Sequence, residues 1–327
     1  MYKTILSLFF LLLSFQGCRS IDEPGTLVPP TTDQDPALSQ ISVNVAGHTR
    51  SLHCFTYGDP QNPPLFVLHG SYDEIRSYRV LQILSDKYYV VMWSQRGCGL
   101  SERITESEFT FDSQVEEVEQ VKALFAPDRP ITLYAHSMGG GTAAMFTARH
   151  PDQVRQLILG EPLVLQGSAM DKIWKDLVEF DYTNTGWNEM AQLNDALPAK
   201  THEELDYRAL MMLKSNMTKY FCDRNNPPDW PVWRIGGFVE MVRNKRIGNA
   251  QSGFSYDFSI GLKDYPNQVL IMGGTCSGLG FANQTTYNQP LFANAKVIKI
   301  ENAGHRYLAE QFEQTIQAMK GYLYEYQ

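Results

Sequence analysis

Hydrophobic and polar positions change their period along the chain. Between residues 41 and 58 apolar and polar residues alternate, which predicts the two arms of an antiparallel hairpin. The later apolar runs are short and continuous, and each ends in a loop: 64–70, 88–93, 131–137, 154–162, 268–274 and 295–305. Such runs are typical of strands that are buried on both faces of a parallel sheet.

Helical patterns lie between these runs. The clearest is 111–125, whose apolar residues form one stripe along the expected helix. Either Asp112 or Ser113 is expected to cap its N-terminus. Alternating strands and helices predict an α/β fold with a doubly wound, mostly parallel sheet. The interval 163–264 breaks this alternation and reads as mainly helical, so we expect a helical cap inserted after the sixth strand.

Three regions of the domain follow from these patterns. The expected core comprises residues 41–162 and 265–327, and the helical cap of residues 163–264 separates the two parts. A chain of 327 residues that is 43% hydrophobic can bury a core of this size. The formal charge of −8 and the absence of a basic cluster exclude nucleic acid as an expected partner.

The N-terminus has the features of an export signal. One cationic residue, Lys3, precedes an apolar stretch over 5–15 that is too short to span a bilayer, which predicts a signal peptide at residues 1–17. The following Cys18 completes the sequence FQGC, which resembles a bacterial lipobox. This resemblance implies lipid attachment at Cys18 and a membrane-anchored protein of the bacterial cell envelope; an ordinary secreted protein is the alternative. Residues 18–40, which include four prolines, are expected to form a tether.

A serine stands at a position that suits a nucleophile. In YAHSMGG, Ser137 directly follows a buried apolar run and opens a glycine-rich helix. A sharp strand-to-helix turn of this kind lifts the serine oxygen above the sheet, where a base can reach it. Ala135 stands where the G-x-S-x-G pattern has its first glycine, and Gly139 fills the second.

Several motifs together resemble the α/β-hydrolase fold family, and within it the capped branch of serine hydrolases that includes esterases and proline iminopeptidases. The motifs are HGS at 69–71, QRGCGLS at 95–101, AHSMGG at 135–140 and NAGH at 302–305. Ser94 departs from the family, which usually has Asp before Gln-Arg-Gly. The HGGPG pattern of the usual proline iminopeptidases is missing as well.

The resemblance implies a role for four residues. Ser137 corresponds to the nucleophile and His305 to the general base. The backbone N–H groups of Ser71 and Met138 correspond to the two donors of the oxyanion hole. The family needs neither a metal nor an organic cofactor, so none is expected.

The acid that orients the histidine is absent from its usual place. The loop after the seventh strand, GGTCSGLG, has no carboxylate, and no Asp or Glu lies between Asp264 and Glu301. Glu161 ends the strand that neighbours the nucleophile strand, and some family members carry their acid there, so we expect Glu161 to be the acid. Glu301, Asp264 and Asn283 are poorer candidates.

The expected function is that of a serine hydrolase acting through an acyl-enzyme on a small-molecule substrate. An aromatic, Met-rich cap favours a carboxylic ester with a partly apolar group. An aminopeptidase of the proline iminopeptidase type, acting on short peptides, and a non-catalytic binding protein on a hydrolase fold are the alternatives. The remaining cysteines are expected to be either free thiols or two bridges, and their spacing does not decide: Cys54, Cys98, Cys222 and Cys276.

Overall fold

The computed structural model describes residues 29–180, 199, 201–216, 220–228, 234–249 and 253–325. The predicted signal peptide 1–17 and the predicted lipid-attachment residue Cys18 lie outside these residues. Within the described ranges, no helix is both long and apolar enough to cross a membrane. The same ranges hold no group of three or more His, Cys, Asp or Glu residues placed to bind a metal ion.

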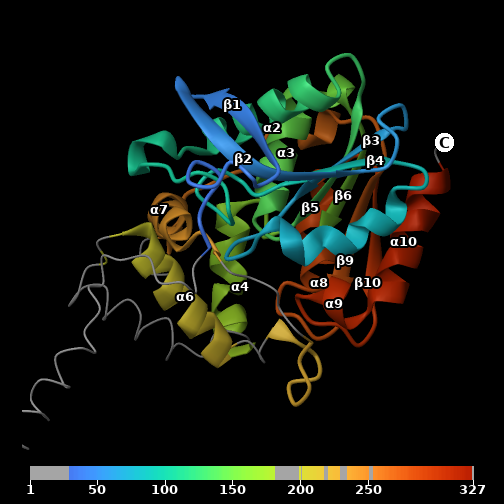
Figure 1. Ribbon diagram of the computed structural model, residues 1–327. Helices are drawn as coiled ribbons and strands as arrows, with labels where there is room; N and C mark the ends of the chain where they lie inside the picture. The colour runs from blue at the N-terminus through green and yellow to red at the C-terminus, as the bar shows by residue number, and fades with distance from the viewer. Residues whose placement is uncertain are drawn as a thin grey trace, which may run out of the picture.

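One eight-stranded sheet forms the centre of the molecule (Figure 1). Its strands, in spatial order, are β1 (Gln40–Val45), β2 (His48–Tyr57), β4 (Tyr89–Trp93), β3 (Pro64–Leu68), β5 (Ile131–His136), β6 (Val154–Gly160), β9 (Val269–Gly274) and β10 (Ala295–Ile300). The β1–β2 and β2–β4 pairs are antiparallel, and every other pair is parallel. The predicted hairpin and the predicted mostly parallel sheet are therefore confirmed.

Helices cover both faces of this sheet. The helical segments of the described residues, those of the cap included, are η1 (Ile75–Leu84), η2 (Glu106–Glu108), α2 (Phe111–Phe125), α3 (Gly139–Arg149), η3 (Pro151–Gln153), α4 (Gly167–Phe180), α6 (His202–Asn216), α7 (Gly237–Ile247), η5 (Leu262–Asp264), α8 (Phe281–Asn283), η6 (Gln284–Asn288), η7 (Gln289–Leu291), α9 (Tyr307–Glu310) and α10 (Phe312–Glu325). One hydrophobic cluster joins α2 and α3 to the sheet, and a second joins η1 and α10 to it.

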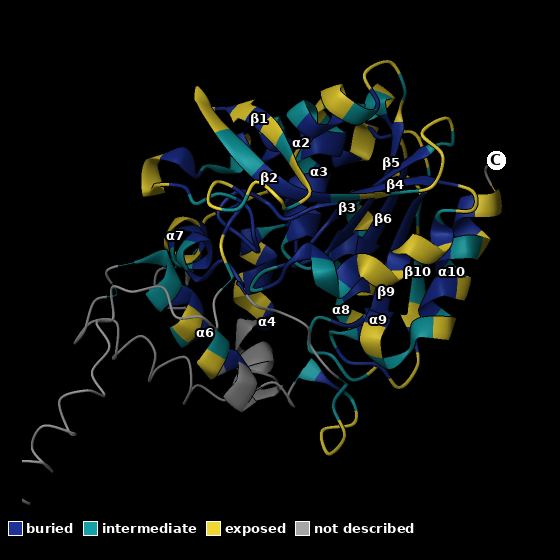
Figure 2. Cartoon of the chain, viewed as in Figure 1, coloured by how far each residue is buried: buried dark blue, intermediate teal, exposed yellow. Residues whose placement is uncertain are grey.

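The central strands are buried on both sides, as their continuous apolar sequences predict (Figure 2). On β5 the side chain of Leu133 belongs to the cluster with α2 and α3, and the next side chain, Tyr134, belongs to the cluster with η1 and α10. Leu157 and Ile158 on β6 divide in the same way. Successive side chains point to opposite faces of a strand, so a strand covered on both faces has no polar side.

The N-terminus of α2 differs from the sequence prediction by a few residues. Thr110, rather than Asp112 or Ser113, is the N-cap, and its hydroxyl accepts a hydrogen bond from the backbone N–H of Ser113. The Ser113 hydroxyl bonds back to the N–H of Thr110, at 2.9 Å. This reciprocal pair satisfies two backbone donors of the first turn, which a single cap inside the helix would not do.

Among the described residues, α4, α6, α7 and the short η5 lie between β6 and β9, within the interval predicted to form the cap. Helix α7 packs Val239 and Val242 against Cys98, Ile104 and Phe109 of the core. A short antiparallel ladder, β7 (Gly248–Asn249) with β8 (Gly253–Phe254), follows α7. The cap therefore contains a two-stranded element as well as helices.

The described end of the predicted tether is packed on the core. Thr31 and Thr32 are buried, and the Thr32 N–H donates to the Leu100 carbonyl at 2.8 Å. The Thr32 hydroxyl also donates to the Ser51 carbonyl. The prediction of a free tether over 18–40 is wrong for these two residues, because a proline-rich stretch can satisfy its polar groups along the edge of a folded domain.

Candidate active site

Ser137 occupies the turn between β5 and α3. Its φ is +52°, in the left-handed region that a residue with a side chain rarely adopts. The Ser137 N–H donates to the Gly160 carbonyl at 2.9 Å, and its carbonyl accepts from Gly140 N–H at 3.0 Å. A strained serine held on both sides by backbone bonds has the form of a nucleophile elbow.

Glycines allow a second loop to approach this elbow. A Cβ at Gly139 would lie 2.5 Å from the His69 carbonyl oxygen, and a Cβ at Gly70 would lie 2.9 Å from Cβ of Ser137. Both separations are shorter than any real Cβ contact, so only glycine fits at either position. The loop after β3 therefore lies directly against Ser137.

Glu161 lies at the end of β6, next to the elbow. It is fully buried and has a φ of +41°. Its backbone N–H donates to the Met272 carbonyl at 2.9 Å, and its Oε1 accepts from the Gly274 N–H at 2.5 Å. These bonds to β9 fix the direction of the side chain, whose other oxygen, Oε2, lies 2.6 Å from Nδ1 of His305.

His305 follows β10 and is 15% exposed. Because a carboxylate only accepts hydrogen bonds, the contact with Glu161 places the hydrogen of the imidazole on Nδ1. The opposite nitrogen, Nε2, then has a free lone pair. Ser137, Glu161 and His305 all follow the carboxyl ends of parallel strands, where functional groups gather in doubly wound sheets.

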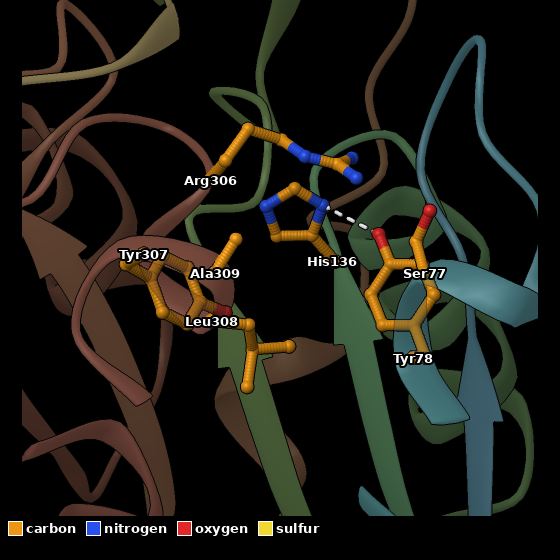
Figure 3. A pocket seen from close by; sticks show the side chains of 7 residues that line it. All are labelled: Ser77, Tyr78, His136, Arg306, Tyr307, Leu308 and Ala309. Carbon is orange, nitrogen blue, oxygen red and sulfur yellow. Dashed lines mark hydrogen bonds between the residues drawn. The ribbon is translucent and has the colours of Figure 1, made fainter. Parts of the chain in front are cut away.

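A second histidine, His136, contacts the backbone and the ring of His305. Nε2 of His136 lies 3.0 Å from the carbonyl oxygen of His305, and the two rings are 4.7 Å apart. The Tyr78 hydroxyl lies 2.8 Å from His136 Nδ1, and the dashed line in Figure 3 marks this hydrogen bond. Burial, with His305 adding to it, lowers the pKa of His136 well below its usual value. His136 therefore stays neutral while it holds the backbone of His305.

A small cavity of about 20 Å³ adjoins this pair, and Tyr78, His136, Arg306 and Tyr307 are among its lining residues (Figure 3). Arg306 is paired with the buried Asp73. Burial alone would raise the pKa of Asp73, but the charge of Arg306 holds that pKa below its usual value. A cavity of this volume admits a single water molecule and no substrate.

The backbone N–H groups of Ser71 and Met138 are the donors that the family resemblance implies for an oxyanion hole. Neither Ser71 N–H nor Met138 N–H donates to another group within the described part of the chain. The loop that carries Ser71 is held by His69, whose Nε2 accepts from Gln95 N–H at 3.0 Å and whose Nδ1 lies 2.8 Å from the Gly70 carbonyl. Burial lowers the pKa of His69, so its ring is neutral and Nδ1 is the donor.

The cap contributes an arginine that the sequence did not indicate. Arg243 of α7 is 2% exposed and is paired with the buried Glu240. One guanidinium nitrogen, Nη1, lies 3.3 Å from the Ser71 hydroxyl. Nε is buried without a hydrogen-bond partner among the described residues. The charged guanidinium of Arg243 thus contacts the loop whose Ser71 N–H is an expected oxyanion donor.

The other candidates for the acid lie away from the histidine ring. Glu301 is exposed and pairs with Lys299 at 2.6 Å. Asp264 is exposed in η5, which precedes β9. The Asn283 amide donates to the Gly278 carbonyl at 2.6 Å. Of the four candidates, the structure brings only Glu161 to His305.

The cysteines form one bridge, so neither of the two expected patterns is right. Cys222 of the cap is bonded to Cys276, in the loop after β9, and their Cα atoms are 5.2 Å apart. Cys54 and Cys98 are free and buried. Burial raises the pKa of Cys54 to about 12, which keeps this thiol protonated and unreactive.

The arrangement of sheet, elbow and histidine loop is that of the alpha/beta hydrolase fold. A family model described as the alpha/beta hydrolase fold matches residues 63–310, and the chain belongs to this family.

Relatives within the family have varied activities. The chain is 24% identical over 289 residues to the monoacylglycerol lipase ABHD6 of Bos taurus, covering 86% of this chain and 82% of that protein. It is 24% identical over 273 residues to a proline iminopeptidase of Saccharolobus solfataricus, covering 80% and 85%. It spans 34% and 39% of the lengths of two further curated relatives. Among solved structures, a bacterial membrane phospholipase A matches with a TM-score of 0.62 and 20% identity, covering 100% of this chain and 99% of that one.

Proposed function

We propose that the protein is a serine hydrolase that cleaves a carboxylic ester with a partly apolar group through an acyl-enzyme. In this proposal Ser137 is the nucleophile, His305 is the general base and Glu161 is the acid that orients it. The observation that carries the proposal is the 2.6 Å contact between Glu161 Oε2 and His305 Nδ1, beside a serine in a strained elbow.

The proposed reaction begins with proton transfer to His305. Nε2 takes the hydroxyl proton of Ser137 as Oγ attacks the ester carbonyl, and the carbonyl oxygen becomes an oxyanion. The imidazolium that forms donates from Nδ1 to Glu161, whose negative charge stabilises it. Nε2 then gives the proton to the departing alcohol, which leaves the acyl group on Ser137. Water activated by Nε2 releases the acid by the same steps.

Backbone donors would stabilise the oxyanion. The Ser71 and Met138 N–H groups have no acceptor within the described residues and flank the elbow. Fixed donors of this kind contribute roughly 3–4 kcal/mol each to the stabilisation of a tetrahedral intermediate. The loop that carries Ser71 is held by the neutral His69 and by the cap residue Arg243, so the Ser71 N–H needs little reorganisation during the reaction.

A fluorophosphonate probe tests the proposed nucleophile. The wild-type protein should be labelled at Ser137, and Ser137→Ala should abolish both the labelling and the hydrolysis of p-nitrophenyl butyrate. A folded wild-type protein that takes no label would contradict the proposal.

A peptidase is the second candidate, because a proline iminopeptidase is among the relatives. The ester proposal predicts turnover of short and medium p-nitrophenyl esters. Cleavage of aminoacyl arylamides without ester turnover would replace it with the peptidase. The binding-protein alternative depended on a missing acid, and the contact of Glu161 with His305 weighs against it.

We also propose that the protein is exported and anchored to a membrane of the bacterial cell envelope through a lipid on Cys18. The FQGC sequence supports this proposal, as does the disulfide Cys222–Cys276, because such bonds persist in oxidising compartments. Cys18→Ala should move the protein from the membrane fraction to the soluble fraction. Equal membrane association of the two forms would contradict the lipid anchor.

A further inference from the structure

The loop after β9 lacks an acid, but it is covalently joined to the cap. Cys276 in this loop is bonded to Cys222, which is 54 residues away in the sequence and belongs to the cap. A covalent bond keeps the loop and the cap segment together even when the non-covalent contacts between them open. The loop that usually supplies an acid in this family therefore serves here as an attachment point for the cap.

This attachment point also holds the loop that carries His305. The Cys276 N–H donates to the Ala303 carbonyl at 2.9 Å. The neighbouring Thr275 hydroxyl accepts from the Asn302 N–H at 3.0 Å. Asn302 has a φ of +54°, so the turn before the histidine is strained and depends on such bonds. Residues 302 and 303 are thus fixed to the bridged loop just before His305.

Glu310, the last residue of α9, makes a second connection between the cap and the histidine loop. Its Oε1 accepts from the Cys222 N–H at 2.5 Å, and its Oε2 accepts from the Gly304 N–H at 2.6 Å. One carboxylate therefore bonds to the backbone of the bridged cysteine and to the backbone of the residue before His305. Each bond joins a charged acceptor to an amide, which makes it stronger than a bond between neutral groups.

The cap segment lies directly against the histidine loop. A Cβ at Gly304 would clash with the Tyr220 carbonyl oxygen and would come within 3.0 Å of Cα of Phe221. The ring of Tyr220 lies 6.4 Å from the ring of His305. Close contact of two backbones leaves no room for the histidine loop to shift unless the cap segment moves too.

We propose that the disulfide Cys222–Cys276 and Glu310 are positioning residues for His305. They press residues 220–222 of the cap onto the 302–305 loop, and this keeps the imidazole aligned between Glu161 and Ser137. The inference rests on the proposed function, in which His305 is the base. Loss of either connection lets the loop move, and a displacement of about 1 Å in a catalytic group lowers the rate by as much as 100-fold.

Two variants test the inference, each with a matched control. Cys222→Ser/Cys276→Ser removes the bridge, and its control is Cys54→Ser, which replaces a free buried cysteine in β2. Glu310→Gln removes the carboxylate, and its control is Glu301→Gln, an exposed carboxylate before the same loop. The full-length protein is assayed for kcat and KM with p-nitrophenyl butyrate and for the rate of fluorophosphonate labelling, well below the Tm of every variant.

Both test variants should lose roughly 10- to 100-fold in kcat and in labelling rate, while KM stays within about threefold. The controls should match the wild type. A triple variant that combines Cys222→Ser/Cys276→Ser with Glu310→Gln should be little slower than the double cysteine variant, because both connections act on one loop. The NMR resonance of the Nδ1 proton shared with Glu161 should broaden in the variants, which a loss of stability elsewhere would not cause.

A lower Tm with unchanged kcat and labelling in both variants would overturn the inference, because the bridge and Glu310 would then only stabilise the fold. If the double cysteine variant fails to fold, the result with Glu310→Gln decides. Failure of the wild-type protein to react with the probe would instead overturn the proposed serine chemistry, so the two failures are distinguishable.

Discussion

Glu161 and His305 are 144 residues apart in the sequence, and the structure places Oε2 of one 2.6 Å from Nδ1 of the other. The second oxygen of Glu161 is engaged by Gly274 N–H at 2.5 Å. The carboxylate thus serves two donors at once, one from the histidine and one from the end of β9. Because both oxygens are occupied, the side chain has a single direction in which to hold the imidazole.

Glu161→Gln should lower kcat by a factor of about 10³–10⁴ and leave KM nearly unchanged. A glutamine has one acceptor oxygen for the two donors, so its NH₂ group must face either Gly274 N–H or His305. The imidazole then takes the wrong tautomer or turns away from Ser137. Steady-state kinetics with p-nitrophenyl butyrate measure the loss, and circular dichroism verifies the fold.

Glu301→Gln is the control for this variant. It removes an exposed carboxylate near the same histidine, and its partner is Lys299. Surface ion pairs of this kind contribute about 0–1 kcal/mol to stability, so its kcat should equal that of the wild type. Turnover by Glu161→Gln at the wild-type rate would remove Glu161 from the mechanism.

Much of the fold is predictable from local patterns in the sequence. Continuous apolar runs identify strands buried on both faces, and the order of strands and helices identifies the parallel sheet. The placement of Glu161 near His305 is predictable for the same reason. Once β6 is known to lie beside the nucleophile strand, a carboxylate at its end is at the edge where the other site residues gather.

The connections between the cap and the core are not predictable in this way. Arg243 and Glu310 stand in amphipathic segments where a charged residue ordinarily faces solvent. Their roles depend on how the cap helices sit on the core, and local periodicity does not determine that. Four cysteines allow several pairings and also free thiols, so the bridge Cys222–Cys276 could not be deduced from spacing.

Arg243→Met should lower both stability and activity, and a second substitution separates the two effects. Alone, it leaves the buried Glu240 without its partner, which should lower the free energy of unfolding by about 3–5 kcal/mol. Arg243→Met/Glu240→Met should recover most of this loss, because an apolar pair replaces a buried ion pair at little cost. Denaturant unfolding measures both values.

The double variant should nevertheless remain about tenfold slower in kcat. The Ser71 hydroxyl loses its contact with the guanidinium, and a hydrogen bond to a charged group is worth about 1.5–3 kcal/mol. Arg246→Met, on the exposed side of the same helix, is the control and should keep full activity. A double variant that is both stable and fully active would show that Arg243 only supports the cap.

Gly139→Ala should separate the elbow from the loop after β3. The new Cβ would lie 2.5 Å from the backbone oxygen of His69, so one of the two backbones must shift. We expect a lower Tm and a loss of activity of at least tenfold, since the expected oxyanion donors lie on these two segments.

Gly321→Ala provides the contrast. No atom lies within 4 Å of a Cβ at this position in α10, so alanine should raise stability by up to about 1 kcal/mol through its helix propensity. Thermal unfolding and ester kinetics measure both variants. Equal behaviour of the two would mean that the close approach at Gly139 has no functional consequence.

His53 should make the fold less stable in acid. This residue of β2 is 4% exposed, and burial, with Arg76 and Arg79 adding to it, lowers its pKa to about 4 from 6.5. Between these two values the unfolded chain binds a proton that the folded chain excludes. The free energy of unfolding therefore decreases as the pH falls from 6.5 to 4, by at most about 1.4 kcal/mol per pH unit for this group.

His53→Gln removes the titrating ring, so the difference in stability between pH 7 and pH 5 should become smaller than in the wild type. Phe55→Leu is the control, because it removes the aromatic ring that packs 4.7 Å from His53 and retains the histidine. It should lower stability by a similar amount at both pH values. Denaturant unfolding at pH 5 and pH 7 gives the comparison, and an unchanged difference in His53→Gln would show that His53 does not govern the loss in acid.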